Sequence, residues 1–363
     1  MRIAVIHGND GSDVRVGKTC RSLSGMGHDV HFIGWDRRPD AAKEIDLGPA
    51  AAHVMTFATP NGRLTTGGQW RFWRHVAGRL WGLRPDVVCC VNEDCALLVL
   101  PFRGLLYRRL VCDVFDALAD RHSGRRGPVR WALRAAGELV RIAADRLIAT
   151  DRVRYERFGR FRRKCTVIAN VPEDPGERLA RSLPSGAVKI YVGGSLSEAR
   201  GLRQVLQAVE KLDGVEILSA GWPYDEFAAE TFLAHPKVSF RGIVTAAESL
   251  ELASRCDAVL AFYEPSSVNN IYASPNKIHD AMSVGRPVIV NSEIRVAGWV
   301  RRRKLGFTCA YGDAGALSRI AGSLRARRSR LGDFAARSRR AFAEGFTWER
   351  MEARLKQLYE GLK

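Results

Sequence analysis

The strongest candidates for binding or catalysis lie in one stretch of the C-terminal half, residues 272–290. Ser274 suits the capping position of a helix and Pro275 its first turn, so a helix is predicted to begin there. Such a beginning presents free backbone N–H groups beside Lys277, which together suit a phosphate or diphosphate. Asp280 lies one turn later on the same face and could accept hydrogen bonds from ribose or sugar hydroxyls. An ordinary capped helix with a surface lysine and aspartate explains the pattern equally well.

Short apolar strands precede and follow this predicted helix and would hold it in place. The same alternation of strands and helices begins at Ile3 and begins again at Val188, after a polar segment with prolines at residues 173–187. Buried strands that are joined by helices form parallel sheets. We therefore expect an α/β fold with two Rossmann-like domains, residues 1–172 and 188–345, that face each other across a cleft.

Carboxylates follow two neighbouring strands of the first predicted domain. Glu93 and Asp94 come directly after one strand, and Asp113 and Asp116 lie at the end of the next. Because ligands of open parallel sheets bind at the carboxyl ends of strands, we give these residues more weight than scattered surface acids. The loop after the first strand, residues 7–13, lacks the G-x-G-x-x-G pattern, so it is not a dinucleotide fingerprint.

The charge of the chain is strongly positive. It has 363 residues and a formal net charge of +18, and residues 121–164 hold 14 Lys/Arg against 4 Asp/Glu. Anionic substrates, anionic membranes and nucleic acid are all compatible with this charge, but no recognition motif for nucleic acid accompanies it. Residues 69–83 form an aromatic and basic helix that could lie at a membrane interface, although a core helix with its aromatic side chains inward fits somewhat better.

Apolar runs and cysteines limit the possible locations and cofactors. No apolar run is long enough to span a bilayer, and the first strand is too short for a signal peptide. We expect a cytoplasmic protein, with peripheral attachment to the inner face of the cell membrane as a further hypothesis. None of the eight cysteines forms a CxxC pair, so we predict reduced core residues rather than a zinc site or a disulfide framework.

Six segments in this order resemble the GT-B-fold glycosyltransferases, in particular the retaining type of family 4. They are residues 13–30, 84–88, 167–172, 194–202, 274–290 and 346–359. Gly194-Ser195-Leu196-Ser197 with Arg200-Gly201-Leu202 resembles the family's G-R-L-x-x-x-K-G-L loop. The last segment resembles its C-terminal helix, which implies that residues 346–363 cross back to the N-terminal domain.

The resemblance implies sugar transfer from a nucleotide diphosphate sugar, of the UDP or GDP type, without a metal ion or other cofactor. Arg200 stands where the family has its diphosphate-binding lysine, and Asp280 where it has the ribose-binding second glutamate of E-x7-E. Lys277 would help Arg200 to offset charge on the leaving diphosphate. The other donor-binding residues would be Gly194, Ser195, Ser274, Pro275 and Asn276. Gly11, Asp13, Arg15, Glu93 and Asp94 would face the acceptor or the bound sugar, with Asp116 in the catalytic region.

Three positions depart from the family's pattern. Tyr272 replaces the first glutamate of E-x7-E, Ser195 replaces the loop arginine, and Phe115 occupies the place of the histidine in the catalytic region. The phosphate-binding residues remain, but these changes leave the donor sugar open.

Several functions stay open at this point. In the retaining mechanism, the donor phosphate itself helps to deprotonate the acceptor, so no protein nucleophile is required. The acceptor would be a glycan, a lipid-linked sugar or a small molecule, in the synthesis of glycans, glycolipids or glycosylated metabolites. The alternatives are a nucleotide-sugar 2-epimerase on the same fold, or a basic protein that docks on membrane or nucleic acid without catalysis.

Overall fold

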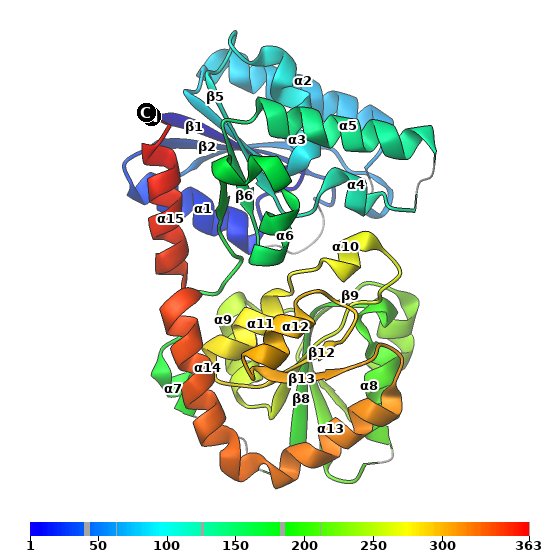
Figure 1. Cartoon of the computed structure of the whole chain (residues 1–363). Coiled ribbons are helices and arrows are strands. Elements are labelled where there is room, and N and C mark those ends of the chain that lie inside the picture. Colours follow the sequence, from blue (N-terminus) through cyan, green and yellow to red (C-terminus); the bar gives the residue numbers. More distant parts are fainter. Residues whose placement is uncertain (40–43, 63, 125–126, 182–185, 211, 363) are drawn as a thin grey trace. The chain divides into compact units, whose positions relative to one another are not determined.

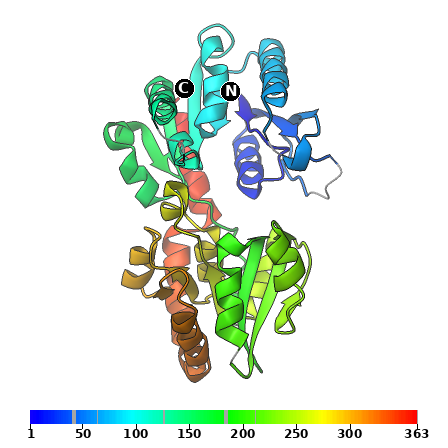
Figure 2. The same ribbon diagram turned by 90° about the vertical axis from the view of Figure 1, so that its right-hand side faces the viewer.

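The computed structural model describes residues 1–39, 44–62, 64–124, 127–181, 186–210 and 212–362. Two compact units make up the chain: unit 1 holds residues 1–169 and 351–363, and unit 2 holds residues 170–350. Each unit contains one parallel sheet flanked by helices (Figures 1 and 2). The prediction of two Rossmann-like α/β domains is thereby confirmed.

The sheet of unit 1 has the strand order β3-β2-β1-β4-β5-β6-β7, and all of its neighbouring strands are parallel. Its strands are β1 Arg2–Ile6, β2 Asp29–Asp36, β3 Ala51–Thr56, β4 Val87–Val91, β5 Arg109–Val114, β6 Arg146–Ala149 and β7 Cys165–Val167. The strand order reverses between β1 and β4, so their carboxyl ends form the topological switch point where ligands of such sheets bind.

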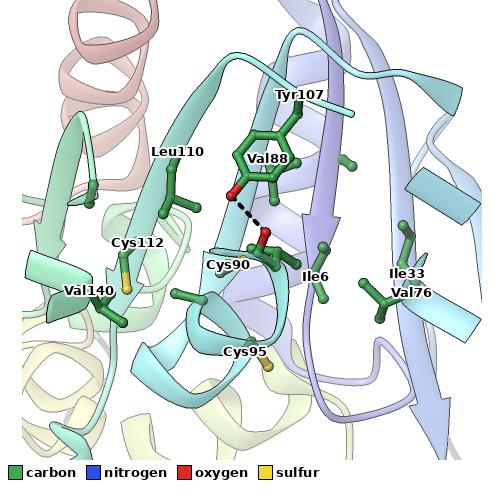
Figure 3. Packing of buried hydrophobic residues seen from close by; sticks show 14 of the residues in the cluster. Ile6, Ile33, Val76, Val88, Cys90, Cys95, Tyr107, Leu110, Cys112 and Val140 are labelled. Carbon is green, nitrogen blue, oxygen red and sulfur yellow. Dashed lines mark hydrogen bonds between the residues drawn. The ribbon is translucent and has the colours of Figure 1, made fainter. Parts of the chain in front are cut away.

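The helices of unit 1 cover this sheet. They are α1 Val14–Gly25, α2 Thr66–Leu83, α3 Asn92–Val99, α4 Leu118–Arg121, α5 Pro128–Ala143, α6 Arg152–Arg157 and most of α15 Trp348–Glu360, with 3₁₀ turns at η1 Pro60–Gly62, η2 Leu100–Phe102 and η3 Gly159–Lys164. Val76 of α2, Cys95 of α3 and Val140 of α5 belong to one buried cluster with Cys90 and Cys112 of the strands (Figure 3). Three helices thus share one core with the middle of the sheet.

The C-terminal helix contributes its later residues to unit 1. Its Met351 sulfur accepts a hydrogen bond from the backbone N–H of Ala169 at 3.1 Å. The Arg354 guanidinium donates to the carbonyl of Val167 at 3.0 Å, and Tyr359 is completely buried. Helix α15 therefore helps to close the core of unit 1.

The sheet of unit 2 has the order β10-β9-β8-β11-β12-β13 and is also parallel. Its strands are β8 Val188–Leu196, β9 Val215–Pro223, β10 Val238–Phe240, β11 Ala258–Ala261, β12 Val288–Asn291 and β13 Gly306–Cys309. Its helices are α7 Glu177–Arg181, α8 Leu202–Glu210, α9 Ala246–Ser254, α10 Val268–Ile271, α11 Asn276–Ser283, α12 Ala297–Arg302, α13 Ala314–Ala326 and α14 Leu331–Gly345, with short turns at η4 Glu198–Arg200, η5 Phe227–Phe232 and η6 Arg328–Arg330. The predicted linker 173–187 contains α7, and its residues 182–185 lie outside the described part of the chain.

A histidine cluster joins β2, β3 and α2 and makes the stability of unit 1 sensitive to pH. The rings of His31 and His53 stack at 5.3 Å, with Nδ1 of His31 at 3.1 Å from Nε2 of His53. Burial, and then the charges of Arg79, His31 and His75, lower the pKa of His53 below its ordinary value of 6.5. The unfolded chain therefore binds a proton at His53 more readily than the folded chain does. As pH falls below about 6.5, this difference lowers the free energy of unfolding.

We expect the free energy of unfolding to decrease between about pH 7 and about pH 5, and less so in His53→Asn. Urea denaturation at the two pH values measures this difference. The exposed His122 provides the control, because His122→Asn should keep the pH dependence of the wild type. An unchanged dependence in His53→Asn would show that the cluster does not contribute.

Candidate active site

Helix α11 of unit 2 begins without a side-chain cap. The capping residue is Pro275, with extended backbone angles of φ −64° and ψ 119°, and Asn276 is the first helical residue. The prediction of Ser274 as the cap was therefore wrong by one position, because Pro275 takes the extended conformation of a cap rather than that of the first turn. Pro275 offers no side-chain acceptor, which leaves the first N–H groups of α11 to an anion, apart from that of Ile278, which donates to the carbonyl of Pro275 at 3.0 Å.

Lys277 lies in the first turn of α11 with its ammonium group held in place. Its Nζ is 3.1 Å from a carboxylate oxygen of Asp280 and 3.4 Å from Oγ of Ser249. Burial, the largest single cause, lowers the pKa of Lys277, but the charge and hydrogen bond of Asp280 together with Tyr191 leave the pKa above its ordinary value. Lys277 is therefore a permanent cation, and a Cβ built on Gly194 would lie 3.9 Å from its Cε.

The glycine-rich segment beside Lys277 is a strand rather than the predicted loop. Strand β8 continues through Gly194 and Ser195 to Leu196, and Ser195 lies opposite Trp222 of β9. A Cβ at Gly221 would stand 1.9 Å from the carbonyl oxygen of Gly194, so this close pairing requires glycine. The predicted glycine-rich loop over residues 193–201 is wrong for residues 193–196, which belong to β8, because the glycines there permit close backbone approach between strands.

Arg200 lies in the turn η4 that follows this strand. Its guanidinium stacks on the ring of Tyr263 at 3.6 Å, and its Nη1 is buried without a hydrogen-bond partner within the described residues. The turn is fixed by Tyr311, whose hydroxyl donates to the carbonyl of Glu198 at 3.2 Å. A buried guanidinium N–H without a partner is costly in a native protein and is satisfied when an anion binds.

Tyr263 supports one of the two predicted phosphate-binding cations, because the Arg200 guanidinium stacks on its ring at 3.6 Å. Sequence reasoning missed Tyr263. This residue comes directly after Phe262 at the carboxyl end of β11, and ligands of parallel sheets bind at such strand ends. Tyr272, at the position of the family's first glutamate, lies 5.6 Å from the guanidinium of Arg295.

In unit 1, the contacts of the loop before α1 mainly stabilise the fold. The carboxylate of Asp13 caps α1 by accepting from the N–H groups of Arg15 at 2.9 Å and Val16 at 3.1 Å. Gly11 has φ +97°, and a Cβ there would stand 3.1 Å from the Phe32 ring. Glycine is therefore needed at Gly11 to keep the loop close to β2.

Arg15 is buried in a two-pronged ion pair with Asp113. The Nη2 atom is 2.8 and 2.9 Å from the two carboxylate oxygens, and the exposed fractions of the side chains are 1% and 6%. Burial raises the pKa of Asp113, although the charge and hydrogen bonds of Arg15 oppose this shift. Such a pair joins β5 to α1 and leaves little of Arg15 for a ligand.

The remaining acidic candidates differ in their exposure. Glu93 is fully buried, where it accepts from the N–H of Leu118 at 2.7 Å and pairs with Arg141 at 2.7 Å. Asp94 pairs with Arg121 at 2.9 Å, but 40% of its side chain remains exposed. Asp116 pairs with Arg154 at 2.9 Å and keeps 37% exposed. Asp94 and Asp116 are thus the carboxylates that a ligand can reach.

His7 is a residue of this region that sequence reasoning did not single out. It follows β1 directly, and its ring lies 6.0 Å from that of Phe115. Burial lowers the pKa of His7, while Asp13 and Asp94 act in the opposite direction. The neutral imidazole therefore lies among the predicted acceptor-side residues, and the rule of strand ends, applied to β1, would have found it.

Among the residues that the structure describes, no three His, Cys, Asp or Glu side chains come together in a way that could hold a metal ion. No described helix has the length and apolar character needed to cross a bilayer. All eight cysteines are free, and seven of them are buried.

Comparisons with known proteins agree with this fold. Residues 10–171 match the family model of the glycosyl transferase 4-like domain, and no curated protein matches the chain significantly. Among solved structures, sucrose-phosphate synthase from Thermosynechococcus elongatus is 15% identical with a TM-score of 0.76, covering 100% of this chain and 99% of that one.

Two further structures share the architecture. Anabaena HepE in complex with UDP-glucose is 16% identical with a TM-score of 0.71, covering 99% of this chain and 100% of that one. WaaG, a glycosyltransferase involved in lipopolysaccharide biosynthesis, is 14% identical with a TM-score of 0.68, covering 98% and 99%. The predicted GT-B fold is confirmed: the chain shares the two-domain architecture of these glycosyltransferase structures, and its residues 10–171 match the glycosyl transferase 4-like domain.

Proposed function

We propose that this protein transfers a sugar from a nucleotide diphosphate sugar to an acceptor hydroxyl, with retention and without a metal ion. The observation that carries the proposal is the buried guanidinium N–H of Arg200 that lacks a partner among the described residues. The Arg200 guanidinium stacks on the ring of Tyr263, and Lys277 lies in the first turn of α11 in the same unit. Two cations and an uncapped helix N-terminus in one unit match the charge and hydrogen-bonding needs of a diphosphate.

The donor chemistry follows from these groups. When the bond between the sugar anomeric carbon and the diphosphate oxygen breaks, negative charge grows on the leaving diphosphate. Arg200 and Lys277 offset that charge, and the first N–H groups of α11 donate to the phosphate oxygens. The leaving oxygen takes the proton of the acceptor hydroxyl as the new glycosidic bond forms on the same face. Asp280, held by Lys277 at 3.1 Å, is oriented to accept from the ribose hydroxyls.

The acceptor side of the proposal rests on unit 1. Asp94 and Asp116 are exposed enough to accept hydrogen bonds from acceptor hydroxyls, whereas Glu93 and Arg15 hold their surroundings in place. His7, whose ring lies 6.0 Å from that of Phe115 and whose pKa is lowered, adds a neutral imidazole on the same side of unit 1. The acceptor would be a glycan, a lipid-linked sugar or a hydroxylated small molecule.

The proposal predicts that a nucleoside diphosphate stabilises the protein against heat. We expect UDP or GDP, and their sugars, to raise the melting temperature, because a ligand at a hundred times its dissociation constant adds about 2.7 kcal/mol. The measurement is a thermal-shift series with UDP, GDP, ADP and dTDP. UDP is the first choice because the similar HepE structure contains UDP-glucose. Absence of a shift with every nucleotide would contradict the donor site.

Product analysis then separates transfer from epimerisation. A transferase yields the free nucleoside diphosphate together with a glycosylated acceptor. A nucleotide-sugar 2-epimerase instead changes the sugar without an acceptor. An epimer formed from the donor alone would therefore replace the proposed function by the epimerase.

A further inference from the structure

Helix α5 has an exposed apolar face that the core does not use. Trp131, Leu139 and Ile142 are 71%, 52% and 57% exposed. Their spacing places them on one side of the helix. The opposite side carries the buried Gly137 and Val140, which pack on unit 1. The helix is therefore apolar on two sides, of which one is covered by its own unit and the other is not.

Arginines without acidic partners border this face. Arg134 lies 5.8 Å from the Trp131 ring, and Arg130 is one helical turn before it. Neither forms an ion pair with a carboxylate among the residues that the structure describes. This combination of large apolar side chains with flanking arginines is typical of helices that lie in a membrane interface.

The turn η3 adds charge along the second half of α5. Lys164 donates to the carbonyls of Ile142 at 3.0 Å and Ala144 at 2.6 Å, so it holds η3 against the C-terminal end of the helix. Arg162 and Arg163 of the same turn are exposed. The resulting surface has basic side chains on the helix itself and on the segment beside it.

Further exposed apolar residues connect to the same end of α5. The Arg103 guanidinium donates to the carbonyl of Ala143 at the end of α5. Two residues on, Leu105 is 64% exposed, and its carbonyl accepts from Arg84 at 2.7 Å. Arg84 also stacks at 4.6 Å on Trp81, which is 62% exposed. Leu105 and Trp81 are thus further exposed apolar side chains of unit 1, connected to the end of α5 through Arg103 and Arg84.

The charge and the aliphatic side chains select one partner for this surface. Residues 121–164 hold 14 Lys/Arg against 4 Asp/Glu, so two copies that met through this face would bring like charges together. Nucleic acid would neutralise the arginines but would leave Leu139 and Ile142 without an apolar partner. An anionic bilayer satisfies both, because its phosphates pair with the arginines and its acyl region receives the apolar side chains.

We propose that the outer face of α5, together with η3, docks on anionic phospholipid bilayers. This inference does not depend on the donor chemistry. It also moves the expected membrane contact away from residues 69–83, because Phe72, Val76 and Leu80 of α2 are buried in the core and Trp70 and Trp81 remain outside. Helix α5 lies in the interface plane in this arrangement and does not cross the bilayer.

The test is flotation of the full chain with vesicles of phosphatidylcholine alone and with added phosphatidylglycerol, at low and high salt. We expect the wild type to bind the anionic vesicles at low salt. The variant Trp131→Ser/Leu139→Ser/Ile142→Ser should lose at least about tenfold in binding, because each large side chain loses apolar burial. Trp222→Ser, which removes an exposed tryptophan of unit 2, is the matched control and should bind like the wild type.

A second variant tests the charge separately. Arg162→Ala/Arg163→Ala should weaken binding to anionic vesicles by about fivefold for each arginine and leave the weak binding to neutral vesicles unchanged. A wild type that does not float with anionic vesicles would overturn the proposal. Equal binding of the wild type and the triple variant would overturn it too.

Discussion

Arg200→Ala and Lys277→Ala are each expected to lower the turnover of the donor by about tenfold to a thousandfold. Each variant removes a cation that offsets charge on the leaving diphosphate, so kcat should decrease more than the affinity for the nucleotide sugar. Arg200 stacks on Tyr263 with a buried N–H that has no partner among the described residues, and Lys277 lies in the first turn of an uncapped helix. The measurement is nucleoside diphosphate release from the donor that the thermal-shift series identifies.

Arg203 provides the matched control for this prediction. It follows Arg200 by three residues, but it pairs with Glu198 at 2.5 Å, and its side chain is 50% exposed. Arg203→Ala should therefore retain nearly full turnover, and Arg200→Lys should recover part of it because the charge remains while the planar guanidinium is lost. Unchanged turnover in both Arg200→Ala and Lys277→Ala would remove these residues from the donor site.

The architecture could be predicted from the sequence because parallel sheets leave a clear pattern. Strands such as Val87–Val91 and Val288–Asn291 are buried along their whole length and appear as continuous apolar runs. Patterns of this kind depend only on neighbouring residues, so they can be recognised without knowledge of tertiary contacts.

The site was less predictable because its side chains meet residues far away in the chain. No pattern in the neighbouring sequence predicts that Arg15 pairs with Asp113, 98 residues away, or that the buried Glu93 pairs with Arg141. Tyr263 and His7 follow strand ends and could have been selected by that rule, but their contacts with Arg200 and Phe115 could not be predicted. Charge type and strand ends select candidates, but burial decides which of them a ligand can reach.

The second large effect is expected in stability rather than in turnover. Asp113→Ala should lower the free energy of unfolding by about 3–5 kcal/mol, because it leaves the Arg15 guanidinium buried without its counter-charge. The exposed fraction of the Arg15 side chain is 1%, so water cannot replace the lost carboxylate. Urea denaturation of the purified variant measures the change.

An exposed ion pair of the same unit is the control for Asp113→Ala. Asp29 pairs with Arg2 at 2.7 Å, but both side chains are about half exposed, and Asp29→Ala should cost about 1 kcal/mol or less. Replacing both buried partners, as in Arg15→Met/Asp113→Leu, should recover much of the lost stability, because apolar side chains of similar size often substitute for a buried pair. If Asp113→Ala lost no more stability than Asp29→Ala, the buried pair would not be the structural link between α1 and β5, and Arg15 would return to the residues available for the acceptor.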